Sequence, residues 1–223
     1  LKKIGRKGLI YLAEKKIKKK NKIFVRINGI DTSDHKKDLE VLKLVENQGL
    51  LIEGIFLPKV EKFEEVKKVY DNFSNTNKRI KIVPIIESKI GVKNLENILK
   101  KDKNNIISHV HYGHFDYCLD ANIWPFPEPY HQEYWKSVGD IIKISNKYNK
   151  YFIQTPFPLI KNYSLFWSMI KYMKEKYKLK KIFLSLVNYD KNFILEPKKV
   201  KNLKIKKISK NLKNNFIFAK KIY

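Results

Sequence analysis

Short apolar runs recur along the chain at intervals of roughly 25 to 35 residues, and amphipathic stretches separate them. This rhythm is typical of βα units, whose parallel strands are covered by helices. We expect strands at 22–28, 53–60, 81–88, 106–113, 151–157 and 181–188. Helical periodicity occupies 34–48, 61–73, 93–101, 131–149 and 162–178. The opening segment also predicts a helix, with its apolar side formed by Ile4, Leu9, Leu12 and Ile17.

Six strands alternating with helices fit either a doubly wound open sheet or most of a (β/α)₈ barrel. No glycine-rich phosphate loop follows any expected strand, which argues against the nucleotide-binding version of the open sheet. Polar residues gather instead at the carboxyl ends of the expected strands, where barrel enzymes carry their active sites. They are Arg26, Asn28, Lys59, Glu87, His111, Gln154 and Thr155.

The predicted fold class is therefore α/β, of the (β/α)₈ TIM-barrel type. Six βα units are visible, and we expect the first two strands of the barrel to be missing from this chain. Residues 1–197 are predicted to form the partial barrel domain. Residues 198–223 are predicted to form a basic tail or a terminal helix.

Composition limits where the protein works. Cys118 is the only cysteine, which excludes an internal disulfide and a cysteine zinc cluster and fits a reducing compartment. The sequence contains neither an apolar run long enough to cross a membrane nor the apolar core of a secretory signal. We expect a cytoplasmic protein with no membrane partner.

The formal net charge of +26 would ordinarily suggest a nucleic-acid partner. Arginine, however, occurs only at Arg6, Arg26 and Arg79, whereas lysine, asparagine and isoleucine are abundant throughout, as an AT-rich coding sequence would produce. A protein that reads bases through bidentate contacts would be expected to use more arginine. We therefore expect no nucleic-acid partner and interpret the lysines as solvated. Weak anion binding stays open for the tail that begins at Lys198.

Two acidic residues close neighbouring expected strands. Glu87 ends the strand in "VPIIES", and Asp116 lies just past the next strand in "GHFDY". Because parallel strands deliver their carboxyl ends to one edge, both carboxylates can point over the same barrel mouth. Two carboxylates suit a hard divalent ion such as Mg²⁺ or Mn²⁺, with water and substrate oxygens completing its shell. Arg26 ends another strand and is a candidate to hold a carboxylate through its two-donor fork.

Four blocks of the sequence together resemble the HpcH/HpaI aldolase and citrate lyase β-subunit superfamily of metal-dependent carbon–carbon lyases. They are "VRINGIDT" (25–32), "GIFLPKVEKFEEV" (54–66), "PIIESKIGVKNLENI" (84–98) and "GHFDYCLD" (113–120). The blocks occur in the family's order and spacing from about residue 22 to 120. Each block alone is a weak signal, and the ordered set is fairly specific.

The resemblance implies a role for each matching residue. Arg26 would bind the carboxylate or enolate oxygen of a pyruvate- or oxaloacetate-like ligand, and Glu87 and Asp116 would hold the metal. Asn28 and Pro58 are expected to contact the substrate. The implied reaction is a retro-aldol or Claisen-type cleavage, in which the metal polarises a carbonyl and stabilises an enolate.

Further expectations concern the two histidines beside the metal and the limits of the resemblance. His111 and His114 are expected to act as acid or base or to support the ligands beside the metal, and simple filling of the barrel interior is the alternative for both. The family's acidic second strand would precede Leu1, so its acids are absent here. The "SLVNYD" segment replaces a common histidine-proline pair, which leaves a CoA thioester substrate possible but unsupported. Relatives form trimers and hexamers, so the resemblance also implies a homo-oligomer.

Two alternatives compete with this reading. His109 and His111 alternate so as to face one side of a strand, which would suit a zinc hydrolase with His114 or Asp116 as a third ligand. The chain could instead be a truncated, catalytically impaired barrel that serves as a binding or assembly subunit. The aromatic segment 120–135 is interpreted as packing, a subunit contact or a lid, and Asp120 as a helix cap or a support for the loop of Asp116.

Overall fold

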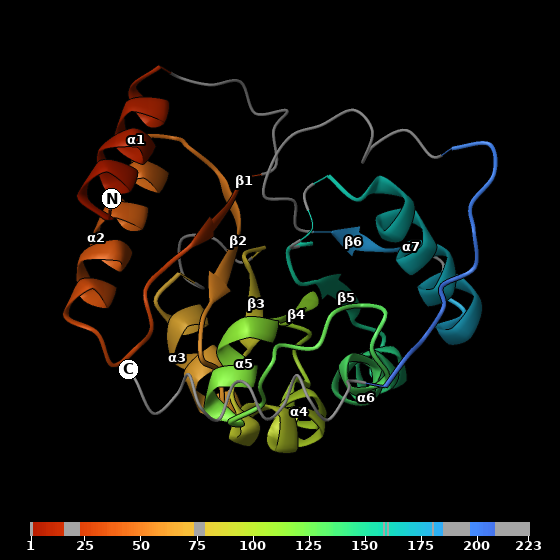
Figure 1. The fold of residues 1–223 in the computed structure, drawn as a ribbon. Coiled ribbons are helices and arrows are strands. Elements are labelled where there is room, and N and C mark those ends of the chain that lie inside the picture. Colours follow the sequence, from red (N-terminus) through yellow and green to blue (C-terminus); the bar gives the residue numbers. More distant parts are fainter. Residues whose placement is uncertain are drawn as a thin grey trace, which may run out of the picture.

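The protein is built around a parallel β-sheet with its strands in chain order (Figure 1). The structure is a computed structural model that describes residues 2–15, 23–73, 79–157, 159, 161–179, 181–184 and 197–207. Its six described strands are β1 (Ile23–Arg26), β2 (Ile52–Leu57), β3 (Lys81–Ile86), β4 (His109–Tyr112), β5 (Tyr151–Gln154) and β6 (Phe183–Leu184). The described helices are α1 (Lys2–Glu14), α2 (Ser33–Asn47), α3 (Phe63–Asp71), α4 (Lys89–Lys101), α5 (His114–Asp120), α6 (Gln132–Lys147) and α7 (Tyr163–Tyr177).

Each expected strand is present, although most end earlier than the apolar runs suggest. The helix expected at 93–101 begins at Lys89, because Ser88 precedes it as an N-cap whose hydroxyl accepts a hydrogen bond from the Gly91 amide at 3.0 Å. The expected opening helix is confirmed up to Glu14, whereas Ile17 and the last part of the sixth expected strand, 185–188, lie outside the described residues. Helix α5 was not predicted.

The sheet curves strongly around its inner face. Adjacent strands in a flat sheet lie about 4.8 Å apart, so β1 and β4 would be separated by roughly 14 Å. The rings of Phe24 in β1 and His109 in β4 nevertheless have centroids only 6.4 Å apart, and those of Phe56 and His111 are 5.9 Å apart. Aromatic rings from several strands therefore fill a shared interior, and the α/β fold is of the TIM-barrel type.

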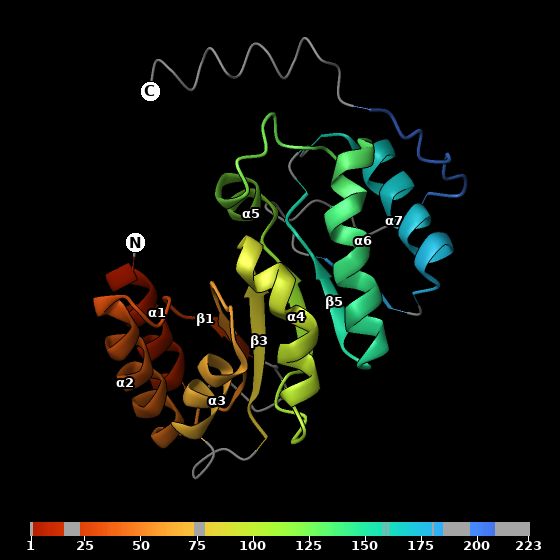
Figure 2. The same ribbon diagram turned by 90° about the horizontal axis from the view of Figure 1, so that it is seen from below.

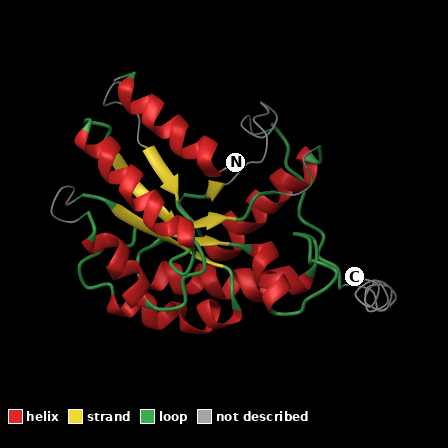
Figure 3. Cartoon of the chain, turned by 90° about the vertical axis from the view of Figure 1, so that its left-hand side faces the viewer, coloured by secondary structure: helices red, strands yellow, loops and turns green. Residues whose placement is uncertain are grey.

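The helices cover the outer face of this curved sheet, as Figures 2 and 3 show. Helices α3, α4 and α6 turn an apolar side toward the strands, and their buried positions recur at helical spacing. Examples are Val66 and Val69 of α3, Leu95 of α4, and Val138 and Ile142 of α6, each without exposed surface. Burying such a side chain stabilises a fold by roughly 1.5–3 kcal/mol, so the layer between strands and helices is the main hydrophobic core.

A buried ion pair ties the amino-terminal ends of β4 and β5 together. The Lys150 amine lies 2.7 Å from the Asp102 carboxylate and also donates to the Asn105 side chain and to the Ile107 carbonyl. Asp102 accepts further hydrogen bonds from the Ile106 and Ile107 amides. Both charged side chains are almost fully buried, at 6% and 0% exposure, and their partners satisfy them within the protein.

Part of the predicted basic tail packs on the helices. The Lys171 amine donates to the Val200 carbonyl, and the Lys206 amide donates to the Tyr130 carbonyl. Val200 and Leu203 lie against the hydrophobic core. Residues 208–223 lie outside the described residues, so the boundary at 197 and the form of the tail stay predictions. In the part of the chain that the structure describes, no helix is both long and apolar enough to cross a membrane.

Candidate active site

A pocket of about 510 Å³ opens at the carboxyl ends of the strands. Five of the predicted site residues line this one pocket: Arg26, Glu87, His111, His114 and Asp116. The remaining lining residues are Phe56, Ile85, Gly113, Phe115, Ile153, Thr155, Pro156 and Phe183. A few charged groups thus converge on a wall that is otherwise largely apolar, which is the composition expected of a small-molecule site.

Glu87 follows β3 and is only 4% exposed. Its Oε1 accepts a hydrogen bond from the Lys59 backbone amide at 3.0 Å. The neighbouring strand makes room for it at Gly113, because a Cβ there would lie 2.5 Å from the Glu87 Cβ and 2.6 Å from its Oε2. The Glu87 side chain therefore occupies the space that a side chain at position 113 would need.

The charges around Glu87 oppose one another. Burial and the nearby Asp116 carboxylate raise the pKa of Glu87, whereas the Arg26 guanidinium and the Lys59 amide act in the opposite direction. Asp116 lies in the first turn of α5 and is exposed, and Arg26 ends β1 and is also exposed. The pocket therefore presents two carboxylates and one guanidinium, which interact through their charges.

The chemistry of this donor set fits a divalent cation. The unfavourable proximity of Asp116 to the buried Glu87 carboxylate is what a hard cation with oxygen ligands would relieve. Glu87 is held by a backbone donor on one side, and Gly113 leaves its other oxygen room. Glu87 and Asp116 are the residues that would hold such an ion.

His111 reaches the same pocket from β4. Both ring nitrogens are buried, and neither has a hydrogen-bond partner among the residues that the structure describes. Burial and the Arg26 charge lower its pKa to about 4, so the ring is neutral near pH 7. A neutral imidazole with two unsatisfied nitrogens is positioned to exchange hydrogen bonds with a molecule bound in the pocket.

The three histidines that suggested a zinc site have different surroundings. His109 lies between the rings of Phe24, Tyr151 and Phe183, and its Nδ1 is 2.8 Å from the Ser108 hydroxyl. Among the described residues, no three histidine, cysteine or acidic side chains form a group that could hold a metal ion. The structure therefore gives the zinc-hydrolase alternative no assembled ligand set.

His114 also lines the pocket, but both nitrogens of its ring face groups of the protein itself. Its Nε2 lies 2.8 Å from the Pro127 carbonyl, which fixes Nε2 as a donor, and its Nδ1 faces the Tyr112 hydroxyl at 3.3 Å and the Cys118 thiol at 3.6 Å. Burial lowers its pKa to about 4. Both nitrogens are therefore occupied inside the protein, and His114 anchors the aromatic segment 120–135.

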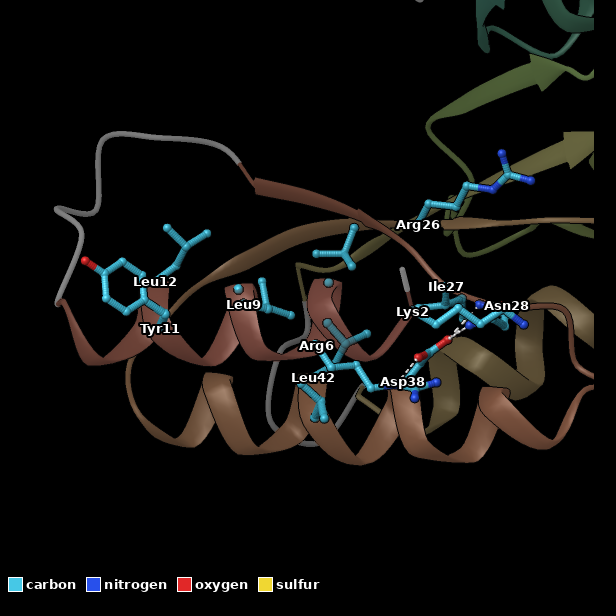
Figure 4. Close-up of a pocket in the computed structure, with 14 residues that line it drawn as sticks. Lys2, Arg6, Leu9, Tyr11, Leu12, Arg26, Ile27, Asn28, Asp38 and Leu42 are labelled. Atoms are coloured by element: carbon cyan, nitrogen blue, oxygen red, sulfur yellow. Dashed lines mark hydrogen bonds and ion pairs between the residues drawn. The ribbon is translucent and has the colours of Figure 1, made fainter.

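Asn28 lies away from the pocket, contrary to its expected contact with the substrate. Its amide and side chain donate to the Asp38 carboxylate at 2.8 and 2.5 Å, and Arg6 donates to the other oxygen of Asp38. Figure 4 shows this group at one end of a separate cavity of about 670 Å³ between α1, α2 and β1, with the Arg26 guanidinium pointing away from it. Pro58 is buried and is not among the residues that line the pocket of Glu87.

The aromatic segment 120–135 is fastened on several sides. Besides the bond to His114, the Trp135 indole donates to the Pro129 carbonyl at 2.6 Å, and the Phe115 and Phe126 rings lie 5.5 Å apart. At its start, Asp120 accepts a hydrogen bond from the Lys89 amide at 2.7 Å, so its predicted capping role is confirmed at the first residue of α4. The segment therefore packs against the pocket-lining residues His114 and Phe115, and none of its own residues is part of the pocket lining.

The sequence did not reveal the parts of the site that cannot be recognised from the type of residue. The Lys59 amide is a backbone group, and Phe115 lies in a helix that was not predicted. Thr155 was noted only as a polar residue near a strand end, and it lines the pocket. Gln154, its neighbour on the opposite face, donates instead to the Tyr134 hydroxyl behind the sheet. The alternation of side chains along β5 explains this division.

Replacing Gly113 by alanine is expected to displace the Glu87 side chain, because the new Cβ would collide with it. We expect divalent-cation affinity to fall about tenfold or more, which corresponds to roughly 1.4 kcal/mol. Titration calorimetry with Mg²⁺ measures the effect. Gly8→Ala is the control, since a Cβ there meets nothing within 4 Å. Equal affinities of the Gly113→Ala variant and the unaltered protein would contradict the tight fit inferred here.

Comparisons with known proteins identify the family of the chain. The profile of the HpcH/HpaI aldolase/citrate lyase family matches residues 6–150. A search of curated proteins finds no significant match. Among solved structures, RipC from Yersinia pestis superimposes with a TM-score of 0.63 and 18% identity, over 82% of this chain and 75% of its own.

Two further structures share the fold at lower identity. The citrate lyase beta subunit from M. tuberculosis, complexed with oxaloacetate and magnesium, gives a TM-score of 0.56 at 14% identity, over 72% of this chain. A citrate lyase from Burkholderia xenovorans LB400 gives 0.65 at 10%, over 80% of this chain. This chain spans only 66% and 59% of those two proteins. Because the family profile covers more than half of the sequence, the chain belongs to the HpcH/HpaI aldolase/citrate lyase family.

Proposed function

We propose that the protein is a divalent-metal-dependent carbon–carbon lyase that acts on a small 2-oxo acid or its acyl adduct. The observation that carries this proposal is the convergence of Glu87, Asp116, Arg26 and His111 on one pocket. It is further supported by family membership and by related structures complexed with magnesium together with oxaloacetate or pyruvate. Mg²⁺ or Mn²⁺ is the proposed cofactor, held by Glu87 and Asp116.

Each pocket residue has a task that follows from its chemistry. The Arg26 guanidinium offers parallel donors to the carboxylate of the substrate and places positive charge beside it. His111, neutral and without a hydrogen-bond partner in the described part of the chain, donates a hydrogen bond to a substrate oxygen. The apolar wall formed by Phe56, Ile85 and Ile153 excludes water from the bond that breaks.

When bound, the cation would supply Lewis acidity at the substrate carbonyl. The residues themselves prepare the site for it, because Glu87 is oriented by the Lys59 amide and Asp116 by its place in the first turn of α5. The structure gives the Lys59 side chain an exposed position, which does not favour a Schiff-base mechanism. Use of a CoA thioester and homo-oligomer formation remain predictions.

The full chain tests the proposal with small 2-hydroxy and 2-oxo acid adducts. We expect release of pyruvate, glyoxylate or a related 2-oxo acid that requires Mg²⁺ or Mn²⁺ and disappears with a chelator. Borohydride added during turnover should trap no covalent lysine adduct. Trapping with undiminished activity in chelator would replace the metal mechanism by a Schiff-base one. A chain that binds the cation and releases no product would instead support the binding-subunit alternative.

A further inference from the structure

Lys59 adopts a backbone conformation that is unusual for its residue type. Its φ is 56°, in the left-handed region that a residue with a Cβ rarely enters. It lies directly after β2, in the loop 58–62, and its side chain is exposed. Since strained backbone of this kind persists only where its surroundings impose it, the contacts of the loop are informative.

The strained residue faces Glu87. In this conformation the Lys59 amide donates to Oε1 of Glu87 at 3.0 Å, and the next amide, that of Val60, donates to the Ile85 carbonyl at 3.3 Å. Both acceptors belong to β3 or to the residue that follows it. The loop after β2 is therefore laid across the end of β3, and one of its amides points at the buried carboxylate.

Two side chains fasten the loop to α4 from the other direction. The Ser88 hydroxyl donates to the Glu61 carboxylate at 2.6 Å, and the Asn94 side chain donates to the Glu61 carbonyl at 3.0 Å. The approach is close, because a Cβ on Gly91 would lie 2.7 Å from the Val60 carbonyl oxygen. Glu61 is thus the point at which the loop is held against the start of α4.

We propose that the loop 58–62 is a positioning device for Glu87, in which Glu61 holds Lys59 in its left-handed conformation so that the Lys59 amide fixes the carboxylate. The Lys59 amine has no part in it. Lys59 and Glu61 are positioning residues, because they act through Glu87. The inference rests on the proposed function, in which Glu87 binds a divalent cation.

The test measures Mg²⁺ affinity of the full chain by calorimetry. Releasing the loop through Glu61→Ala should weaken binding about tenfold, the equivalent of one charge-assisted hydrogen bond. Glu61→Gln keeps an acceptor for Ser88 and should restore affinity to within about twofold. Asn94→Ala releases the same loop from the other contact and should also weaken binding. Glu64→Ala is the matched control, because that exposed carboxylate pairs with Lys101 on the surface.

Two substitutions of Lys59 separate conformation from charge. Lys59→Gly removes the amine and favours the left-handed region, so it should bind Mg²⁺ as the unaltered chain does. Lys59→Val removes the amine and disfavours that region, so it should bind several-fold more weakly. Equal losses in both variants, or undiminished binding in Glu61→Ala, would overturn the proposal.

A second readout does not depend on metal binding. The proton resonance of the Lys59 amide, measured by NMR, should move upfield in Glu87→Gln and in Glu61→Ala as the hydrogen bond to the carboxylate is weakened. If the unaltered chain binds no divalent cation but this resonance moves, the proposed function fails and the positioning role stands. If the cation binds and the resonance stays in place, the positioning role fails.

Discussion

Replacing Glu87 by glutamine is expected to abolish divalent-cation binding. The substitution keeps the size of the side chain and removes its negative charge. The carboxylate that is lost is buried, accepts a hydrogen bond from the Lys59 amide and is repelled by the Asp116 carboxylate. A hard cation would be left with Asp116 alone from this pair, and we expect affinity to fall by more than about a hundredfold. Calorimetry with Mg²⁺ and Mn²⁺ measures the loss, and metal-dependent product release should fall to background.

The matched control for this substitution is Glu96→Gln. Glu96 lies on the exposed side of α4, where its carboxylate pairs with Lys147 at 2.5 Å. The same chemical change should therefore leave cation affinity unaltered. Glu87→Gln relieves a buried charge, and we expect it to keep or raise the melting temperature. Retention of full cation affinity in Glu87→Gln would remove Glu87 from the metal site and with it the main support for the proposed chemistry.

Replacing Lys150 by methionine is expected to lower the free energy of unfolding by about 3–5 kcal/mol. The change keeps an apolar stem of similar length and deletes the ammonium, so Asp102 retains a buried negative charge without its counter-ion. The Asn105 side chain and the Ile107 carbonyl lose a donor at the same time. Chemical denaturation followed by circular dichroism measures the loss. Cation affinity should persist, because the pair lies at the other end of the sheet from Glu87.

Lys147→Met serves as the control for this loss. Lys147 is also a lysine of the α6–β5 region that forms an ion pair, and its side chain is 65% exposed. Surface pairs of this kind contribute about 0–1 kcal/mol, so the variant should unfold close to the unaltered chain. Similar losses from both substitutions would mean that burial does not determine the contribution of the Asp102–Lys150 pair, and the significance given to it would be wrong.

The strand–helix rhythm allowed the fold class to be predicted, because strands buried on both faces need continuous apolar runs. The positions of site residues were predictable where they follow from the alternation of inward-facing and outward-facing side chains along a strand. Arg26 and His111 occupy positions whose side chains turn into the barrel, and Glu87 continues the inward series of β3. Strand order in the sheet then brings them together. Whether these residues bind metal and substrate as expected stays a prediction.

Partners distant in sequence explain why two of the expected site residues are already hydrogen-bonded within the protein. His114 and Asn28 have the residue types of a polar site, and their neighbours in the sequence gave no sign of the Pro127 carbonyl and the Asp38 carboxylate that occupy them. Helix α5 escaped prediction because seven residues are too few to display a period. The Lys59 amide escaped because every residue except proline has one.

The position of the Asp102–Lys150 pair has a consequence for how such a protein can change over evolutionary time. The proposed metal-binding and substrate-binding residues lie at the carboxyl ends of the strands, whereas the Asp102–Lys150 pair connects the amino ends of β4 and β5. Residues around the mouth, such as Phe115 and Thr155, can therefore be exchanged without weakening this pair. Single substitutions near the pocket can therefore change substrate preference, because the stabilising contribution of this buried ion pair at the opposite end of the barrel is unaffected by them.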